Sequence, residues 1–189
     1  MTSQSAANAS QLSAAGFAPS DALEAAILVD LPPGAYTAIV EGAGGGTGVA
    51  VVGVYEVGSP QAPLINISTR GKVLTGNDVM IGGFVLDGTG SRTVAIVATG
   101  PSLAPFGIQG ALADPGLALV RSSDQAILAI NDDWQGDPKA AQLLAAGFAP
   151  TDPLEAALLV TLPPGAYTVV VQGIAGGTGV AVIGVYMVQ

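Results

Sequence analysis

The 189-residue sequence contains no cysteine and no histidine. Without cysteine there are no disulfides, thiolate metal ligands or cysteine nucleophiles, and without histidine there is no Ser-His-Asp arrangement. A hydroxyl nucleophile such as Ser68, Thr69 or Ser102 would need Lys, Asp or Glu as its base, and none of these three stands in such a pattern. We therefore expect that the chain is not an enzyme and has no catalytic residues.

Charged residues are also scarce, at 10% of the chain against about 25% in an average globular domain. There are five Lys and Arg against fourteen Asp and Glu, and the net charge is −9. Because no basic stripe is present, binding to nucleic acid is not expected. With 50% apolar residues, the composition favours folding over disorder.

Long hydrophobic runs are missing as well. Gly, Pro or Asp interrupts every apolar stretch before it reaches the roughly 18 residues of a membrane-spanning helix, so no membrane insertion is expected. The first ten residues, MTSQSAANAS, have neither the basic nor the apolar region of a signal peptide. This chain is therefore expected to carry no signal peptide of its own.

What the sequence does contain is the same passage twice. Residues 11–57 and 142–188 match at 35 of 47 positions without a gap, at a constant offset of 131, whereas the stretch between them occurs once. This pattern predicts a complete repeat unit over 58–189, preceded over 1–57 by a partial repeat that corresponds to the second half of a unit.

The pattern of short apolar segments predicts an all-β fold. Segments rich in Val, Ile, Leu and Tyr recur about every ten residues between Gly, Pro, Asp and Asn, which is typical of an antiparallel β-sandwich, here expected to be jelly-roll-like. We expect one short helix, begun by Asp137-Pro138 and ended by Gly147, and a less ordered equivalent near residues 6–15. The partial repeat should add an extra three-stranded piece. The predicted strands are 24–30, 35–41, 48–57, 62–68, 78–86, 92–99, 116–121, 125–131, 154–161, 166–172 and 179–188.

Two glycine clusters, GAGGGTG at 42–48 and GIAGGTG at 173–179, raise the question of a phosphate cradle. Neither is followed by Lys-Ser/Thr or by a predicted helix, and neither has the GxGxxG spacing. We interpret both as flexible hairpin loops between strands.

An acidic cluster is the candidate metal site. Asn131, Asp132, Asp133 and Asp137 lie within seven residues, and clustered oxygen ligands suit Ca²⁺. The spacing is not that of an EF-hand, and an Asx-rich turn that bonds its own backbone is the competing interpretation. Otherwise no cofactor is expected.

Trp134, the single tryptophan, is the candidate ligand-binding residue. An exposed indole would offer a sugar-stacking platform, whereas a packed indole would belong to the core or its rim. Carbohydrate is therefore a possible partner that the sequence alone does not decide.

The single-copy stretch contains a series of short motifs: Asn66–Arg70 (NISTR), Ile81–Phe84 (IGGF), Gly100–Leu103 (GPSL), Ala113–Pro115 (ADP) and Asn131–Trp134 (NDDW), followed by LPPGAYT and GTGVAVIGVY. Through these motifs it resembles a repeat of large secreted and cell-surface proteins of environmental bacteria. The resemblance implies an extracellular or cell-surface location more than an activity.

The second half of the repeat is also similar to the bacterial pre-peptidase C-terminal type of β-sandwich, through its Asn-Asp-Asp turn and Leu-Pro-Pro-Gly strand. The partial repeat departs from the pattern, because Met1–Ser3 occupies the positions of Asp132–Trp134 and the NDDW motif is missing there.

The functional expectation follows from the partial repeat. Its strands are apolar on both faces and need cover, either within the chain or from a neighbouring chain. We expect a non-catalytic structural module of a secreted or cell-surface assembly, a homo-oligomer or a filament joined head-to-tail by strand pairing. The alternative is a carbohydrate- or surface-binding module of a larger secreted protein, and a hydrolase comes third.

Overall fold

A computed structural model describes residues 6–58 and 63–188 of the chain. The chain divides into two units, Met1–Leu64 and Ile65–Gln189, which are described separately below. We call the described residues 6–58 the leading segment and the second unit the sandwich. The predicted repeat boundary at 57/58 stays a prediction.

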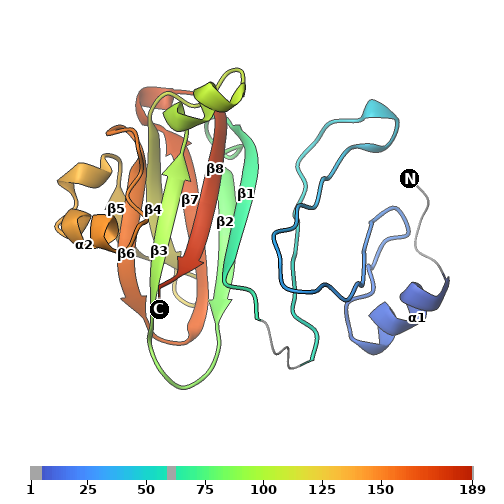
Figure 1. Cartoon of the computed structure of the whole chain (residues 1–189). Helices are drawn as coiled ribbons and strands as arrows, with labels where there is room; N and C mark the ends of the chain where they lie inside the picture. The colour runs from blue at the N-terminus through green and yellow to red at the C-terminus, as the bar shows by residue number, and fades with distance from the viewer. Residues whose placement is uncertain (1–5, 59–62, 189) are drawn as a thin grey trace. The chain divides into compact units, whose positions relative to one another are not determined.

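The sandwich consists of eight antiparallel strands in two sheets of four (Figure 1). One sheet has the order β1-β8-β3-β6 and the other has the order β2-β7-β4-β5. This order is that of a jelly roll, so the predicted fold is confirmed. The strands are β1 (Asn66–Val73), β2 (Met80–Leu86), β3 (Arg92–Thr99), β4 (Pro115–Arg121), β5 (Ala126–Asn131), β6 (Ala156–Leu162), β7 (Gly165–Gly173) and β8 (Gly179–Met187).

The main core lies between the two sheets. Its side chains follow the alternation of each strand, as in β7, where Tyr167, Val169 and Val171 are buried while Thr168 and Val170 are only partly covered. Seven of the eight strands begin within two residues of their predicted starts. The predicted start of the remaining strand, residue 62, lies outside the described residues. β1 continues beyond its predicted end at residue 68, because it pairs with β8 as far as Val73↔Gly179.

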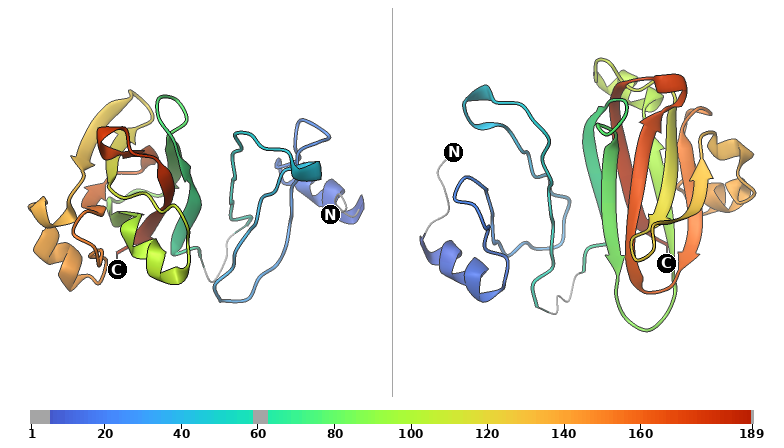
Figure 2. Two further views of the ribbon diagram at one scale, coloured as in Figure 1. Left: turned by 90° about the horizontal axis from the view of Figure 1, so that it is seen from above. Right: turned by 180° about the vertical axis from the view of Figure 1, so that it is seen from behind.

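A second, smaller core covers the outside of the first sheet. Helix α2 (Ala140–Ala145) buries Leu143 against Ala95, Ala157 and Leu159 of β3 and β6. Figure 2 shows α2 on the outside of the sandwich. Short 3-10 helices are η2 (Pro101–Phe106), η3 (Trp134–Gly136) and η4 (Ile174–Gly176). No helix among residues 6–58 and 63–188 is long and apolar enough to cross a membrane.

The leading segment contains helix α1 (Ala6–Ala14) and the helical turn η1 (Ala43–Gly45), and no strand is present among its described residues (Figure 1). The predicted strands 24–30, 35–41 and 48–57 are therefore wrong for this chain. Near residues 6–15 the helix α1 spans nine residues where α2 spans six, and the prediction that this stretch is less ordered stays a prediction. Alanine-rich sequence favours a helix locally, so α1 needs no partner strand.

The topology explains why the leading strands do not form. The three strands of the trailing copy never pair with one another: β6 pairs with β3, β8 pairs with β1 and β3, and β7 pairs with β2 and β4. Strand propensity alone does not make a sheet, because the stabilising unit is the cross-strand pair. The partial repeat holds the equivalents of β6, β7 and β8 without any of the strands that pair with them.

Candidate functional site

The predicted metal ligands form a turn that bonds largely to backbone. Both ends of the Asn131 amide are used: its Nδ2 donates to Asp133 O (3.1 Å), and its Oδ1 accepts from Ala157 N of β6 (2.9 Å). Asp132 Oδ1 accepts from Asp133 N (3.0 Å) and Asp137 Oδ1 accepts from Lys139 N (2.7 Å). These are the bonds of an Asx-rich turn.

A fourth carboxylate, which was not predicted as part of this site, lies near the turn. Asp114 Oδ1 is buried without a hydrogen-bond partner in the described part of the chain. Burial, and then the charges of Asp133 and Asp132, raise the pKa of the Asp114 carboxyl. No group of three or more acidic, His or Cys side chains suited to a metal is present among residues 6–58 and 63–188. Weak Ca²⁺ binding at Asn131, Asp132, Asp133 and Asp137 stays a prediction.

Trp134 packs into the smaller core. Its indole Nε1 donates to Asp152 O (3.1 Å), and its ring contacts the cluster formed by Ala95, Leu143, Ala157 and Leu159. The side chain is half-buried. A ligand-binding role for Trp134 also stays a prediction.

Glu155 is the one buried acidic side chain in the described part of the chain, at 1% exposure. Its Oε1 accepts from the backbone N–H groups of Gly100 and Ser102 (2.9 Å each), and its Oε2 accepts from Ser102 Oγ (2.8 Å). The carboxylate thus caps the start of η2 and fixes the entry of β6 to the loop after β3. The composition gave no signal for this role, because any of fourteen acids was an equal candidate.

The leading segment repeats the local contacts of the trailing copy, residues 137–188. In the leading segment Phe17 stacks on Tyr55, with ring centroids 4.8 Å apart, and in the trailing copy Phe148 lies 5.1 Å from Tyr186. Tyr36 Oη donates to Pro32 O over 2.8 Å, as Tyr167 Oη does to Pro163 O. The two copies therefore share these local side-chain contacts.

Further local bonds agree in the same way. Asn8 Nδ2 donates to Leu28 O (3.4 Å), and at the equivalent position Lys139 Nζ donates to Leu159 O (2.9 Å).

Each of the two glycine clusters closes one tight helical turn. A Cβ on Gly42 would lie 1.9 Å from Gly46 O, and a Cβ on Gly173 would lie 2.0 Å from Gly177 O. Both clusters therefore serve loop closure. The hairpin interpretation is wrong, because the cluster at 173–179 joins β7 and β8, which lie in different sheets, and the cluster at 42–48 lies beside no described strand.

The two copies differ in what covers them. Six large apolar side chains of the leading segment are between 46% and 81% exposed, whereas their equivalents in the trailing copy are between 0% and 7% exposed. The pairs are Ile27 and Leu158, Leu31 and Leu162, Tyr36 and Tyr167, Val40 and Val171, Val52 and Ile183, and Val54 and Val185. Glu24, the equivalent of Glu155, is exposed, and its Oε2 accepts only from Asp21 N (3.4 Å) among the bonds described.

This difference is large in free energy. Fully burying one such side chain contributes about 1.5 to 3 kcal/mol, so covering the six to the extent seen in the trailing copy would contribute about 5 to 10 kcal/mol. That sum is comparable to the whole stability of a domain, about 5 to 15 kcal/mol. The exposed apolar side of the leading segment is therefore the candidate functional site of this protein.

Comparison with known proteins adds one distant structural likeness. No family model matches the sequence, and no curated protein matches it. The chain is similar to a crystal structure of the pre-peptidase C-terminal domain of a collagenase from Bacillus anthracis, with a TM-score of 0.41 and 16% sequence identity. The match covers 64% of this chain and 89% of the collagenase domain. That domain is of the type that the second half of the repeat resembles. A likeness this distant carries no argument about activity or ligand, and the resemblance to the bacterial surface repeat stays a prediction.

Proposed function

We propose that this chain is a non-catalytic structural module of a secreted or cell-surface assembly, joined to a neighbouring polypeptide through its leading segment. The observation that carries the proposal is the matched pair of copies. Leu158, Val171 and Val185 fill the core of the sandwich. Their equivalents in the leading segment, Ile27, Val40 and Val54, are exposed. An exposed apolar surface of this kind marks an interaction site.

The composition supports the non-catalytic part of the proposal. The sequence holds no His and no Cys. The buried carboxylate Glu155 is occupied by two backbone N–H groups and one hydroxyl, which is a structural role. The proposed extracellular location rests on the resemblance to the bacterial surface repeat. A head-to-tail filament of this chain is one form that such an assembly would take.

The experiment compares the full chain with a variant that carries Ile27→Asp, Val40→Asp and Val54→Asp. The mass of each in solution is measured by light scattering across a concentration series, with electron microscopy at the highest concentration. We expect the unmodified chain to associate more than the triple variant, through contact of its exposed apolar side without strand pairing, because three charges prevent burial of that side.

The control carries three Asp substitutions at Gln11, Ser13 and Thr47, which are exposed and whose equivalents Gln142, Leu144 and Thr178 are exposed in the trailing copy too. If the unmodified chain stays a strict monomer at every concentration and also fails to bind any added polypeptide partner, the assembly role is wrong.

A further inference from the structure

Each strand that the leading segment does not form has an equivalent in the sandwich. With the offset of 131, residues 25–31 correspond to β6, residues 34–42 to β7 and residues 48–56 to β8. In the sandwich these strands fill the places beside β3, between β2 and β4, and between β1 and β3. The complement of the leading segment is therefore a set of strands equivalent to β1–β5, in the same antiparallel register.

A second copy of this chain does not supply that complement in free form. Each chain contains the β6–β8 sequence twice and the β1–β5 sequence once, because the stretch between the two copies occurs only once. In the sandwich, β6–β8 already occupy the chain's single β1–β5 set. If two chains exchanged strands, a different β6–β8 sequence would be left over. Each chain would still contribute one β6–β8 sequence without strands to pair with.

Resting on the proposed structural role, we infer that the partner of the leading segment is a half unit: a polypeptide stretch equivalent to β1–β5, without β6–β8 strands of its own. Such a stretch supplies antiparallel edges for all three strands, on the same polypeptide or on another. Strand addition of this kind gives affinity through main-chain bonds and specificity through alternate side chains.

Glu24 defines the first specific contact. By equivalence with Glu155, its carboxylate accepts from two backbone N–H groups and one hydroxyl of a loop that corresponds to Gly100–Ser102. The partner therefore carries a glycine at the first position of that loop, because a Cβ on Gly100 would lie 2.2 Å from Leu112 O. The serine two residues later supplies the hydroxyl.

Ala38 defines a second contact, and it distinguishes the two copies. Its equivalent, Val169, is fully buried, opposite Gly82 of β2 and Leu119 of β4. The smaller alanine leaves room there, so the natural partner carries a bulkier side chain at one of those two positions. With the β1–β5 sequence of this chain as the partner, a void is expected at Ala38, and Ala38→Val should fill it.

The test adds the missing half to the full chain. A second copy of residues 59–131 is placed directly before Met1, because Met1 is equivalent to Asp132. Hydrogen exchange of peptides within residues 24–57 is then measured by mass spectrometry in the extended and the unextended chain. We expect exchange in this stretch to slow by about 100-fold or more in the extended chain, approaching that of residues 155–187.

Two substitutions test whether the ordering is specific. In the extended chain, Glu24→Ala should speed exchange of residues 24–57 by about tenfold or more, and Ala38→Val should slow it. Neither should change exchange in the unextended chain. A trans arm, in which a tagged polypeptide of residues 59–131 is co-expressed with the full chain, shows whether the half unit also binds without a covalent link.

Each other outcome overturns the inference. If residues 24–57 of the extended chain exchange as fast as before, or slow without responding to either substitution, the half unit is not the partner. If the unextended chain alone protects residues 24–57 at high concentration, a second copy is the occupant, and the half-unit inference fails while the structural role stands. A failure of the structural role itself appears instead in the mass measurements of the triple Asp variant.

Discussion

The leading segment and the trailing copy have nearly the same sequence and two different structures. Over 47 residues they match at 35 positions, yet one forms three strands of a sandwich and the other forms none. Their local contacts agree, including the Phe–Tyr ring contact and the Tyr hydroxyl bond to a Pro carbonyl. The difference teaches that these sequences specify turns and side-chain pairs by themselves, but become strands only beside β1–β5.

The largest expected effect comes from placing a charge at one pair of equivalent valines. Val171 is fully buried in β7 and Val40 is 60% exposed. Val171→Asp should destabilise the sandwich by about 3 to 5 kcal/mol, because the charge is buried without a partner. Val40→Asp should change its stability by less than about 0.5 kcal/mol. Urea unfolding followed by Trp134 fluorescence measures both, and equal effects at the two valines would contradict the comparison.

The two equivalent glutamates give the next largest effect. Glu155→Ala removes three hydrogen bonds and leaves the N–H groups of Gly100 and Ser102 unsatisfied, which should cost about 2 to 4 kcal/mol. Glu24→Ala removes only a long local bond and should leave the unfolding midpoint unchanged. The same unfolding assay applies to both variants. A large effect of Glu24→Ala in the unextended monomer would mean that the leading segment is already paired.

Asp114 has no equivalent in the leading segment, because it lies in the single-copy stretch. A substitution there therefore changes the stability of the sandwich alone. Its pKa is raised above 3.8 in the folded chain, mainly by burial, so the folded state binds its proton more tightly than the unfolded state does. Stability from this group is therefore present at low pH and is lost as the pH rises from 3.8 through the folded pKa. Asp114→Asn should raise the urea midpoint at pH 7, and this gain should shrink as the pH falls through the folded pKa and be absent below about 3.8. A lowered midpoint at pH 7 would show that the charge is needed, for example by a bound cation.

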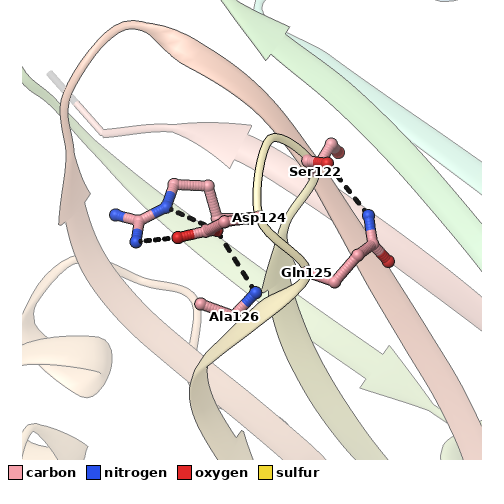
Figure 3. A network of polar contacts seen from close by, with 5 residues as sticks. Ser122, Asp124, Gln125 and Ala126 are labelled. Atoms are coloured by element: carbon pink, nitrogen blue, oxygen red, sulfur yellow. Dashed lines mark hydrogen bonds and ion pairs between the residues drawn. The ribbon is translucent and has the colours of Figure 1, made fainter.

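The smallest expected effect is at the β4–β5 hairpin, which the leading segment also lacks. Figure 3 shows Asp124 in this turn, where its carboxylate accepts from Arg121 Nε (2.9 Å) and Nη2 (2.7 Å) and from Ala126 N (3.3 Å). Arg121 lowers the pKa of Asp124 to about 2, so this stability is present above pH 3.8 and is lost as the pH falls toward 2.

Both side chains of this ion pair are exposed, so Asp124→Asn should lower the thermal midpoint only slightly at pH 7 and not at all near pH 2. Thermal melts of the two proteins at both pH values make the measurement. An equal loss at both pH values would assign the effect to the turn rather than to the ion pair.

Much of the sandwich followed from the sequence, because its strands carry a period-two pattern between turn residues. The Pro-Pro-Gly turns, the glycine loops and the position of α2 are local features, and they were predictable for the same reason. The missing strands of the leading segment were not predictable from pattern, because Ile27, Val40 and Val54 have the same strand propensity as their buried equivalents. What decides their structure is the pairing order, in which β6, β7 and β8 need β1–β4 and not one another.

The candidate site was predictable only as a place, the partial repeat, and not as a set of contacts. Glu155 was hidden among fourteen acids, and its role depends on the loop at Gly100 that the topology brings to the start of β6. Asp114 carried no signal either, since its partnerless oxygen is a property of packing.

Hydrogen exchange of the unmodified chain at low concentration tests the central claim most directly, because both copies are measured in one sample. Peptides from residues 24–57 and 155–188 are distinguished by mass at the positions where the copies differ. We predict nearly unprotected exchange across 24–57 and strong protection of their equivalents in β6, β7 and β8. Equal protection of the two copies in a monomer would contradict the claim that these sequences need β1–β5 to become strands.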